Sequence, residues 1–162
     1  MIIVSDATPI ISLAKIDKLA LLGQFYTEVI LPNAVFSEVC RNPAFAVEAE
    51  AIRKCSFMKI KTANNPHSIK ILKAVGLDLG ESEAIALADT LPDPLLLIDE
   101  RKGRLIAQNM GIKVIGTLGV LLQAKRAGLI EQIKPLLDTL VNANIRISEP
   151  LYRSILEQAD EA

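Results

Sequence analysis

Aromatic residues are scarce in this chain: it has no Trp, and aromatic side chains make up 4% of its 162 residues. The apolar content is therefore mostly Leu, Ile, Val and Ala, a composition that suits helices packed on a sheet. No apolar run approaches the about 20 residues that a membrane-spanning helix needs. The start of the chain lacks a basic segment followed by a long apolar one, so we expect no signal peptide.

Cysteine and histidine are also rare. The two cysteines, Cys40 and Cys55, form no CxxC motif, and the only histidine is His67. These residues do not make a zinc-binding pattern. We expect both cysteines to be free thiols in a protein of the reducing cytoplasm.

No charge of one sign is in excess, because the net charge is −1. This argues against a protein that coats nucleic acid by bulk electrostatics, since such binding neutralises many phosphates with Lys and Arg. It does not exclude a nuclease, because metal cations held by carboxylates neutralise phosphate locally. The absence of a glycine-rich phosphate loop counts against a phosphatase-like or small-ligand α/β protein.

Short apolar runs alternate with helix-forming segments almost throughout the chain. This alternation predicts a parallel α/β sheet with helices on both faces. The length suits a single domain over residues 1–162, with C-terminal helices from about residue 130. The expected strands are Ile2–Ser5, Tyr26–Leu31, Phe57–Ile60, Leu95–Ile98 and Val114–Ile115.

The expected helices follow from capping and breaking residues as well as from periodicity. Thr8 and Pro9 suit an N-cap and a first helical turn, and Gly76–Gly80 reads as a turn. The helical segments are expected at residues 10–14, 18–22, 33–39, 44–54, 66–75, 81–89, 101–109, 117–126, 130–141 and 149–159.

Two acids follow directly on expected strands. Asp6 comes after Ile2–Ser5, and Asp99 comes after Leu95–Ile98. Ligands of open α/β sheets bind beyond the carboxyl ends of the strands, so the two acids lie close together if these strands are neighbours. The alternative for each is to cap the helix that follows it.

Two further acids are candidates from helices. Glu38 lies three residues after Val35, near the apolar stripe of its helix, and Glu83 lies four residues before Leu87, beside a packed face. Glu81 is the competitor of Glu83. Alternatively, Glu38 is a surface acid, and Glu81 and Glu83 are first-turn acids stabilised by the helix dipole.

Carboxylates that cluster repel one another and are tolerated where a divalent cation binds among them. Ligand sets made only of oxygen favour Mg²⁺ or Mn²⁺. A cation of this kind most often acts on phosphate esters. The acids therefore point to a metal-dependent enzyme of phosphoester chemistry.

Five stretches along most of the chain form a recognisable set: SDATPIISLAKI (5–16), LPNAVFSEV (31–39), GESEAIALA (80–88), LLIDERKGRLIA (96–107) and GIKVIGTLGVLLQAKRAGLI (111–130). In this order and spacing they resemble PIN-domain proteins, the fold of VapC-type toxin ribonucleases, and most closely a subgroup of small prokaryotic PIN proteins. The resemblance implies a three-layer α/β/α fold with a central, mostly parallel sheet of four to five strands.

The resemblance also implies an Mg²⁺- or Mn²⁺-dependent endoribonuclease, the toxin of a toxin–antitoxin pair, with RNA as substrate, a cognate antitoxin and a homodimer as partners. Carried over by position, the catalytic residues are Asp6, Glu38, Glu83 and Asp99, with Glu81 as the alternative to Glu83. Asp6, Glu38 and Asp99 are then the metal ligands.

One departure from the family is visible. Many PIN toxins carry a further acid after the last strand, where this chain reads GTLG and has Thr117. Thr117 either caps the next helix or orients a metal-bound water, and Glu100 is expected to point outward. One metal is therefore expected rather than two, and a degenerate PIN-like binding or regulatory protein remains the alternative function.

Basic residues follow Asp99 directly. Arg101 and Arg104 lie one turn apart, where they could contact an incoming phosphate. A solvated helix face with ion pairs is the alternative, especially for Lys102. There is no basic stripe interleaved with aromatic residues, so base stacking is not expected.

Overall fold

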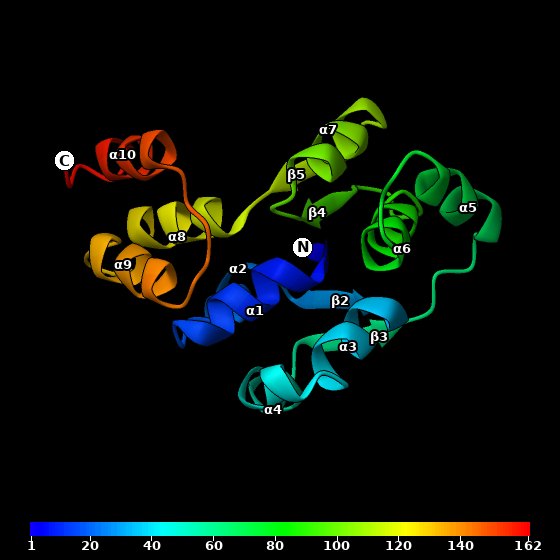
Figure 1. Cartoon of the computed structure of the whole chain (residues 1–162), viewed down its shortest axis with the longest axis horizontal. Coiled ribbons are helices and arrows are strands. Elements are labelled where there is room, and N and C mark those ends of the chain that lie inside the picture. Colours follow the sequence, from blue (N-terminus) through cyan, green and yellow to red (C-terminus); the bar gives the residue numbers. More distant parts are fainter.

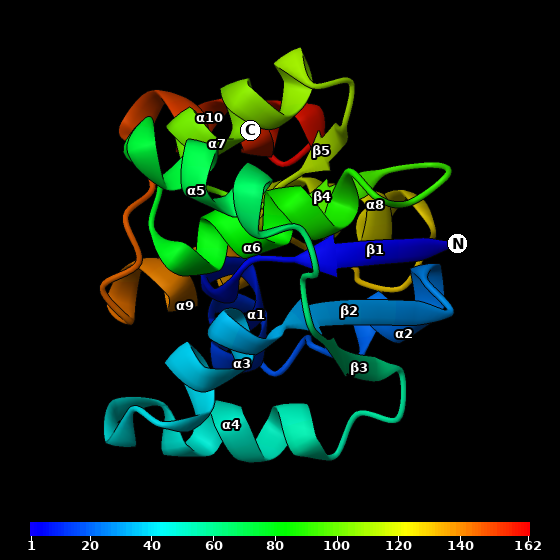
Figure 2. The same cartoon turned by 90° about the vertical axis from the view of Figure 1, so that its right-hand side faces the viewer.

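The computed structural model describes residues 1–162 and contains one parallel sheet of five strands in the order β3-β2-β1-β4-β5. Figure 2 shows the sheet in this order, with β1 and β4 near its centre. Every expected strand is present: Ile2–Ser5 has the expected bounds, and the ends of the other strands shift by at most two residues. The strands are β1 (Ile2–Ser5), β2 (Glu28–Pro32), β3 (Met58–Lys61), β4 (Leu95–Leu97) and β5 (Lys113–Ile115).

Ten α-helices and one 3₁₀ turn, η1 (Pro43–Phe45), connect and follow the strands (Figure 1). The α-helices are α1 (Ala7–Lys15), α2 (Leu21–Phe25), α3 (Asn33–Cys40), α4 (Ala46–Arg53), α5 (Pro66–Ala74), α6 (Leu79–Ala88), α7 (Arg101–Asn109), α8 (Thr117–Arg126), α9 (Lys134–Asn142) and α10 (Glu149–Gln158).

Helices cover both faces of the sheet because successive side chains of a strand point to opposite faces. In β1, Ile3 and Val4 are both fully buried, yet they belong to two separate apolar clusters. The cluster around Ile3 includes residues of α1–α4 and α8–α10, and the cluster around Val4 includes residues of α5–α7. The predicted three-layer α/β/α architecture is therefore confirmed.

Several helix ends differ from the sequence prediction. Asp6, not Thr8, occupies the N-cap of α1. Asp17 adopts a left-handed backbone (φ 56°) after α1, so the chain turns there and α2 starts only at Leu21. Helix α6 starts at Leu79 rather than at residue 81, because Asp78 and Glu81 form a capping box there.

The last two helices were predicted, but α9 begins later than expected. Pro135 stands in the first turn of α9, where its missing N–H costs no hydrogen bond, and residues 130–133 precede the helix. No helix of the structure is long and apolar enough to cross a membrane. Cys40 and Cys55 are free thiols, as expected.

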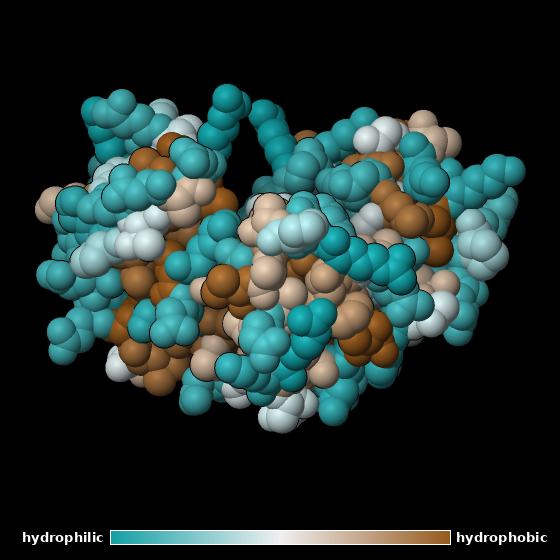
Figure 3. Space-filling model, turned by 60° about the horizontal axis from the view of Figure 1, so that its bottom comes forward, coloured by the Kyte–Doolittle hydropathy of each residue, from teal (hydrophilic) through white to brown (hydrophobic).

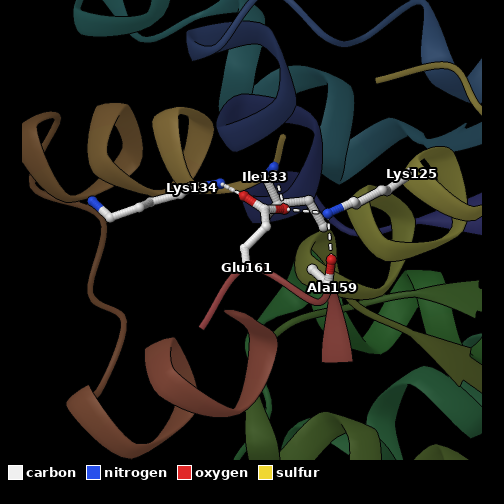
Figure 4. A network of polar contacts seen from close by, with 5 residues as sticks. All are labelled: Lys125, Ile133, Lys134, Ala159 and Glu161. Carbon is white, nitrogen blue, oxygen red and sulfur yellow. Dashed lines mark hydrogen bonds and ion pairs between the residues drawn. The ribbon is translucent and has the colours of Figure 1, made fainter. Parts of the chain in front are cut away.

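One carboxylate ties the end of the chain to the start of α9 (Figure 4). Glu161 accepts hydrogen bonds from the backbone amides of Ile133 (2.8 Å) and Lys134 (3.0 Å) and from Lys125 Nζ (2.9 Å). Lys125 also donates to the Ala159 carbonyl. The Glu161 side chain is only 9% exposed, so it joins α8, α9 and the segment after α10 where solvent screens little.

Replacing Glu161 with Gln should lower the free energy of unfolding by about 1–3 kcal/mol, because charge-assisted hydrogen bonds to a nearly buried acceptor are weakened. Glu157→Gln, on the exposed side of α10, is the matched control and should change stability by less than about 0.5 kcal/mol. Urea denaturation measures both. Equal stabilities of the two variants would show that the Glu161 contacts do not hold the C-terminal helices.

Candidate active site

The two acids at strand ends lie on adjacent strands. β1 and β4 pair in parallel with Ser5 opposite Leu97, and the Asp6 amide donates to the Leu97 carbonyl at 2.9 Å. Asp6 follows β1, and Asp99 lies two residues beyond the end of β4. The parallel pairing thus brings both acids to the same edge of the sheet.

Asp6 is the most deeply buried acid of this edge, with 5% of its surface exposed. Although it occupies the N-cap position of α1, its side chain accepts no capping hydrogen bond. Burial raises the pKa of Asp6 to about 7, and repulsion from Asp78, Glu38 and Asp99 adds to the shift, while the Ala7 amide opposes it. Capping therefore does not account for this carboxylate.

Asp99 is held by the start of α8. Its Oδ1 accepts from the Thr117 amide (2.7 Å) and its Oδ2 accepts from the Thr117 hydroxyl (2.6 Å). A Cβ atom at Gly116 would lie 2.7 Å from Asp99 Oδ1, so this close approach requires glycine. Thr117 is therefore a positioning residue for Asp99, and Gly116, not Thr117, is the N-cap of α8.

Asp99 does not cap α7 either, because Glu100 does so. Glu100 accepts hydrogen bonds from the amides of Lys102 (2.9 Å) and Gly103 (2.6 Å). Desolvation opposes the ionisation of Glu100, but these two bonds, the bond to Glu81 and attraction to Lys102 together lower its pKa. Glu100 is exposed, as expected, and its carboxylate caps the start of α7.

Helices α3 and α6 add acids to the same region, along a groove of about 560 Å³ lined by Glu38, Asp78 and Glu83. Glu38 is exposed overall, yet a Cβ atom at Gly80 would lie 3.2 Å from its Oε2, so the carboxylate faces α6. Desolvation and repulsion from Asp78 raise the pKa of Glu38.

Asp78 is the acid that sequence reasoning missed. It lies at the N-cap of α6, where its Oδ1 accepts from the Glu81 amide at 2.8 Å. Its charge raises the pKa of Asp6, Glu38 and Glu81. The Asp-Leu-Gly-Glu pattern of residues 78–81 is a signal for a helix start, but nothing in it shows that Asp78 faces the other acids.

Glu81 and Glu83 have different surroundings. Glu81 Oε1 accepts from the Asp78 amide (3.0 Å), whereas Glu83 Oε1 accepts from the Ala34 amide at the start of α3 (3.1 Å). Burial raises the pKa of Glu81 to about 7, and the neighbouring acids Asp78, Glu100 and Asp6 contribute. The charges of neighbouring acids thus act on Glu81, whereas Glu83 links α6 to the start of α3.

These acids have no cationic partners. None of the six ion pairs in the structure includes Asp6, Glu38, Asp78, Glu81 or Asp99. An oxygen-only donor set in which the pKa values of Asp6, Glu38 and Glu81 are raised fits a hard divalent cation. No three of these side chains converge closely enough to coordinate one ion as placed, so binding requires the carboxylates to draw together.

The two arginines predicted to meet substrate lie on the first turn of α7. Arg104 donates to the Ile98 carbonyl (2.8 Å), and its Nη1 would lie 3.1 Å from a Cβ atom at Gly116. Arg104 is thereby fixed beside the Asp99 turn. Arg101 is exposed and forms no ion pair.

One of the comparisons with known proteins found a match. A family model described as PIN domain matches residues 2–161 of the chain. No curated protein and no solved structure matches the chain.

Asp6→Asn should stabilise the chain in EDTA at pH 8 by about 2–4 kcal/mol, since one pKa unit corresponds to about 1.4 kcal/mol. The raised pKa means that folded Asp6 binds its proton more tightly than unfolded Asp6, so wild-type stability falls as pH rises from about 4 through 7. The gain from Asp6→Asn should accordingly shrink at pH 4. Thermal unfolding at both pH values measures it, and an equal gain at pH 4 and pH 8 would contradict the electrostatic cause.

Proposed function

The chain belongs to the PIN-domain family, and on that premise we propose that it is a metal-dependent endoribonuclease that hydrolyses RNA phosphodiesters. PIN domains are generally nucleases and typically use divalent metals. Mg²⁺ or Mn²⁺ is the expected cofactor because the donor set consists of oxygen atoms.

The observation that best supports the proposal is that Asp6 is buried without a counter-ion. It is a buried carboxylate with no counter-ion and no capping hydrogen bond, and the charges of three other acids help to raise its pKa. A protein without use for such a group gains stability by losing it, because an unpaired buried charge is costly. Active sites are where such shifts concentrate.

We assign the metal to Asp6, Glu38 and Asp99. When bound, the cation supplies an activated water and stabilises negative charge that develops on the phosphate. The fourth acid would orient the attacking water. We favour Glu81 over Glu83 for this role, because burial and the acids Asp78, Glu100 and Asp6 raise the pKa of Glu81, whereas Glu83 is hydrogen-bonded to the start of α3. Asp78 supplies further negative charge at this edge.

The chain's own residues then have distinct tasks. Thr117 fixes both oxygens of Asp99. Glu81, with a pKa raised to about 7, suits a group that takes a proton from the attacking water near neutral pH. As water attacks phosphorus in line, the bond to the leaving oxygen breaks, and Arg104 and Arg101 neutralise charge on the phosphate.

A toxin role with a cognate antitoxin and a homodimeric assembly belong to the same proposal and rest on the family resemblance. The second candidate is a degenerate PIN-like binding or regulatory protein. Two observations favour it: Thr117 stands where many PIN toxins have an acid, and no three acids are pre-arranged to bind a metal.

Asp6→Asn should reduce cleavage of a fluorophore-quenched single-stranded RNA in Mg²⁺ or Mn²⁺ by at least about 100-fold, because it removes a charged ligand at the centre of the site. Asp93→Asn is the matched control, since Asp93 is an exposed acid that precedes β4 at the opposite edge of the sheet. It should leave the rate unchanged.

Wild-type protein that cleaves no RNA with either cation would support the degenerate alternative. The same conclusion follows if Asp6→Asn and Asp93→Asn cleave equally well. Growth arrest on expression that Asp6→Asn relieves would support the toxin role.

Thr117→Val should weaken Mn²⁺ binding and slow cleavage by about 10- to 100-fold, as expected when a residue that orients a metal ligand is lost. Thr117→Ser keeps the hydroxyl and should restore most of the rate. Isothermal titration with Mn²⁺ and the cleavage assay give the two readouts. If Val and Ser variants behave alike, the hydroxyl of Thr117 does not position Asp99.

A further inference from the structure

A cavity of about 350 Å³ opens beside Asp99 and Thr117, on the side of α1 and the C-terminal helices. Figure 3 shows the molecule hollowed between its C-terminal part, at the left, and the rest. One wall is formed by the connection between α9 and α10, which Figure 1 shows running past α8. The hydrophobic residues that line the cavity are Leu118, Leu140, Ile145, Ile147 and Leu151.

Helix α1 contributes two hydroxyl groups to this cavity. Thr8 and Ser12 lie one helical turn apart and therefore share a face of α1. Ser12 is 1% exposed, and its hydroxyl has no hydrogen-bond partner in the structure. Since buried polar groups are normally hydrogen-bonded, an unpartnered hydroxyl in a cavity wall points to a ligand that completes it.

The rim of the cavity carries a free cation. Arg146 is exposed, lines the cavity and takes part in none of the ion pairs. Asn144 beside it has a left-handed backbone (φ 65°), which turns the chain at this rim. Arginine binds phosphate oxygens through paired N–H donors.

The cavity therefore offers an apolar slot, hydroxyl groups on its wall and a cation at its mouth, directly beside the acids. We propose that it binds the base of a nucleotide that flanks the scissile phosphate in single-stranded RNA, with Arg146 on a neighbouring phosphate. This inference rests on the proposed function and adds a sequence preference to it.

A single-stranded substrate is required because the base must leave its stack to enter the slot. No aromatic side chain lines the cavity, so stacking does not hold the base. Apolar contacts and hydrogen bonds to the base edge remain, and these depend on which base is present. The cavity should therefore discriminate among bases.

The test is an NMR titration of the metal-free protein with the four ribonucleoside 5′-monophosphates and the four unphosphorylated nucleosides. One base should bind most tightly and shift the amide signals of Ser12 and Ile145. Arg146→Gln should weaken the nucleotide by about three- to tenfold and leave the nucleoside unchanged. Arg126→Gln, which removes an exposed charge from the last turn of α8, should change neither affinity.

Ser12→Ala separates a ligand contact from a structural role. The variant should unfold at the same denaturant concentration as wild type, because it breaks no hydrogen bond of the free protein. It should reduce the preference among the four nucleotides by about two- to tenfold. A loss of stability with unchanged nucleotide preference would overturn the role of Ser12.

A second experiment tests the proposed function separately: the protein is incubated with a randomised single-stranded RNA pool in Mn²⁺, and the bases next to each cut are determined by sequencing. If the RNA is cleaved without base preference next to the cut and no nucleotide binds, the proposal of a base-binding cavity is wrong, but the proposed nuclease activity is supported. If nucleotides bind at Ser12 and Ile145 but no RNA is cleaved, the proposed nuclease activity is wrong, but the base-binding cavity is supported. Preferred bases that agree between the two experiments support both.

Discussion

The parallel pairing of β1 with β4 is the constraint on which the site depends. These strands are far apart in the chain, yet the bond from the Asp6 amide to the Leu97 carbonyl places Asp6 and Asp99 at the same sheet edge. The pairing is stabilised from both faces, because Ile3 and Val4 are fully buried in separate apolar clusters. Both helical layers thus contribute to holding two repelling carboxylates together.

Packing of α6 against α3 completes what the sheet begins. This contact brings Asp78 and Glu38 to one groove, where the charge of Asp78 helps to raise the pKa of Glu38. In the free protein, burial of apolar side chains in the two clusters offsets the free-energy cost of repulsion among these carboxylates. A bound cation would turn this repulsion into a favourable interaction. Gly80 at the start of α6 and Gly116 at the N-cap of α8 let the backbone approach Glu38 and Asp99 closely.

Local patterns predicted the strands well, since short buried runs of branched residues between helix-forming segments have few other interpretations. They also placed Asp6 and Asp99, because a strand end is a local feature. Helix ends were less predictable: Thr8 looked like an N-cap, but the turn after β1 makes Asp6 the first residue outside α1. Asp78 escaped notice because it lies in the segment 76–80 that the sequence predicts as a turn, where nothing local shows that it approaches the other acids.

The sequence by itself determined the α/β class, the strand ends that carry Asp6 and Asp99, and the membership suggested by five spaced motifs, because these depend on periodicity and on residues near one another in the chain. Only the tertiary structure decided that Glu81 is buried beside other acids while Glu83 bonds α3, that Thr117 holds Asp99, and that Ser12 and Arg146 line one cavity. Each of these depends on side chains from elements far apart in the chain, whose distances are set by how the helices pack on the sheet.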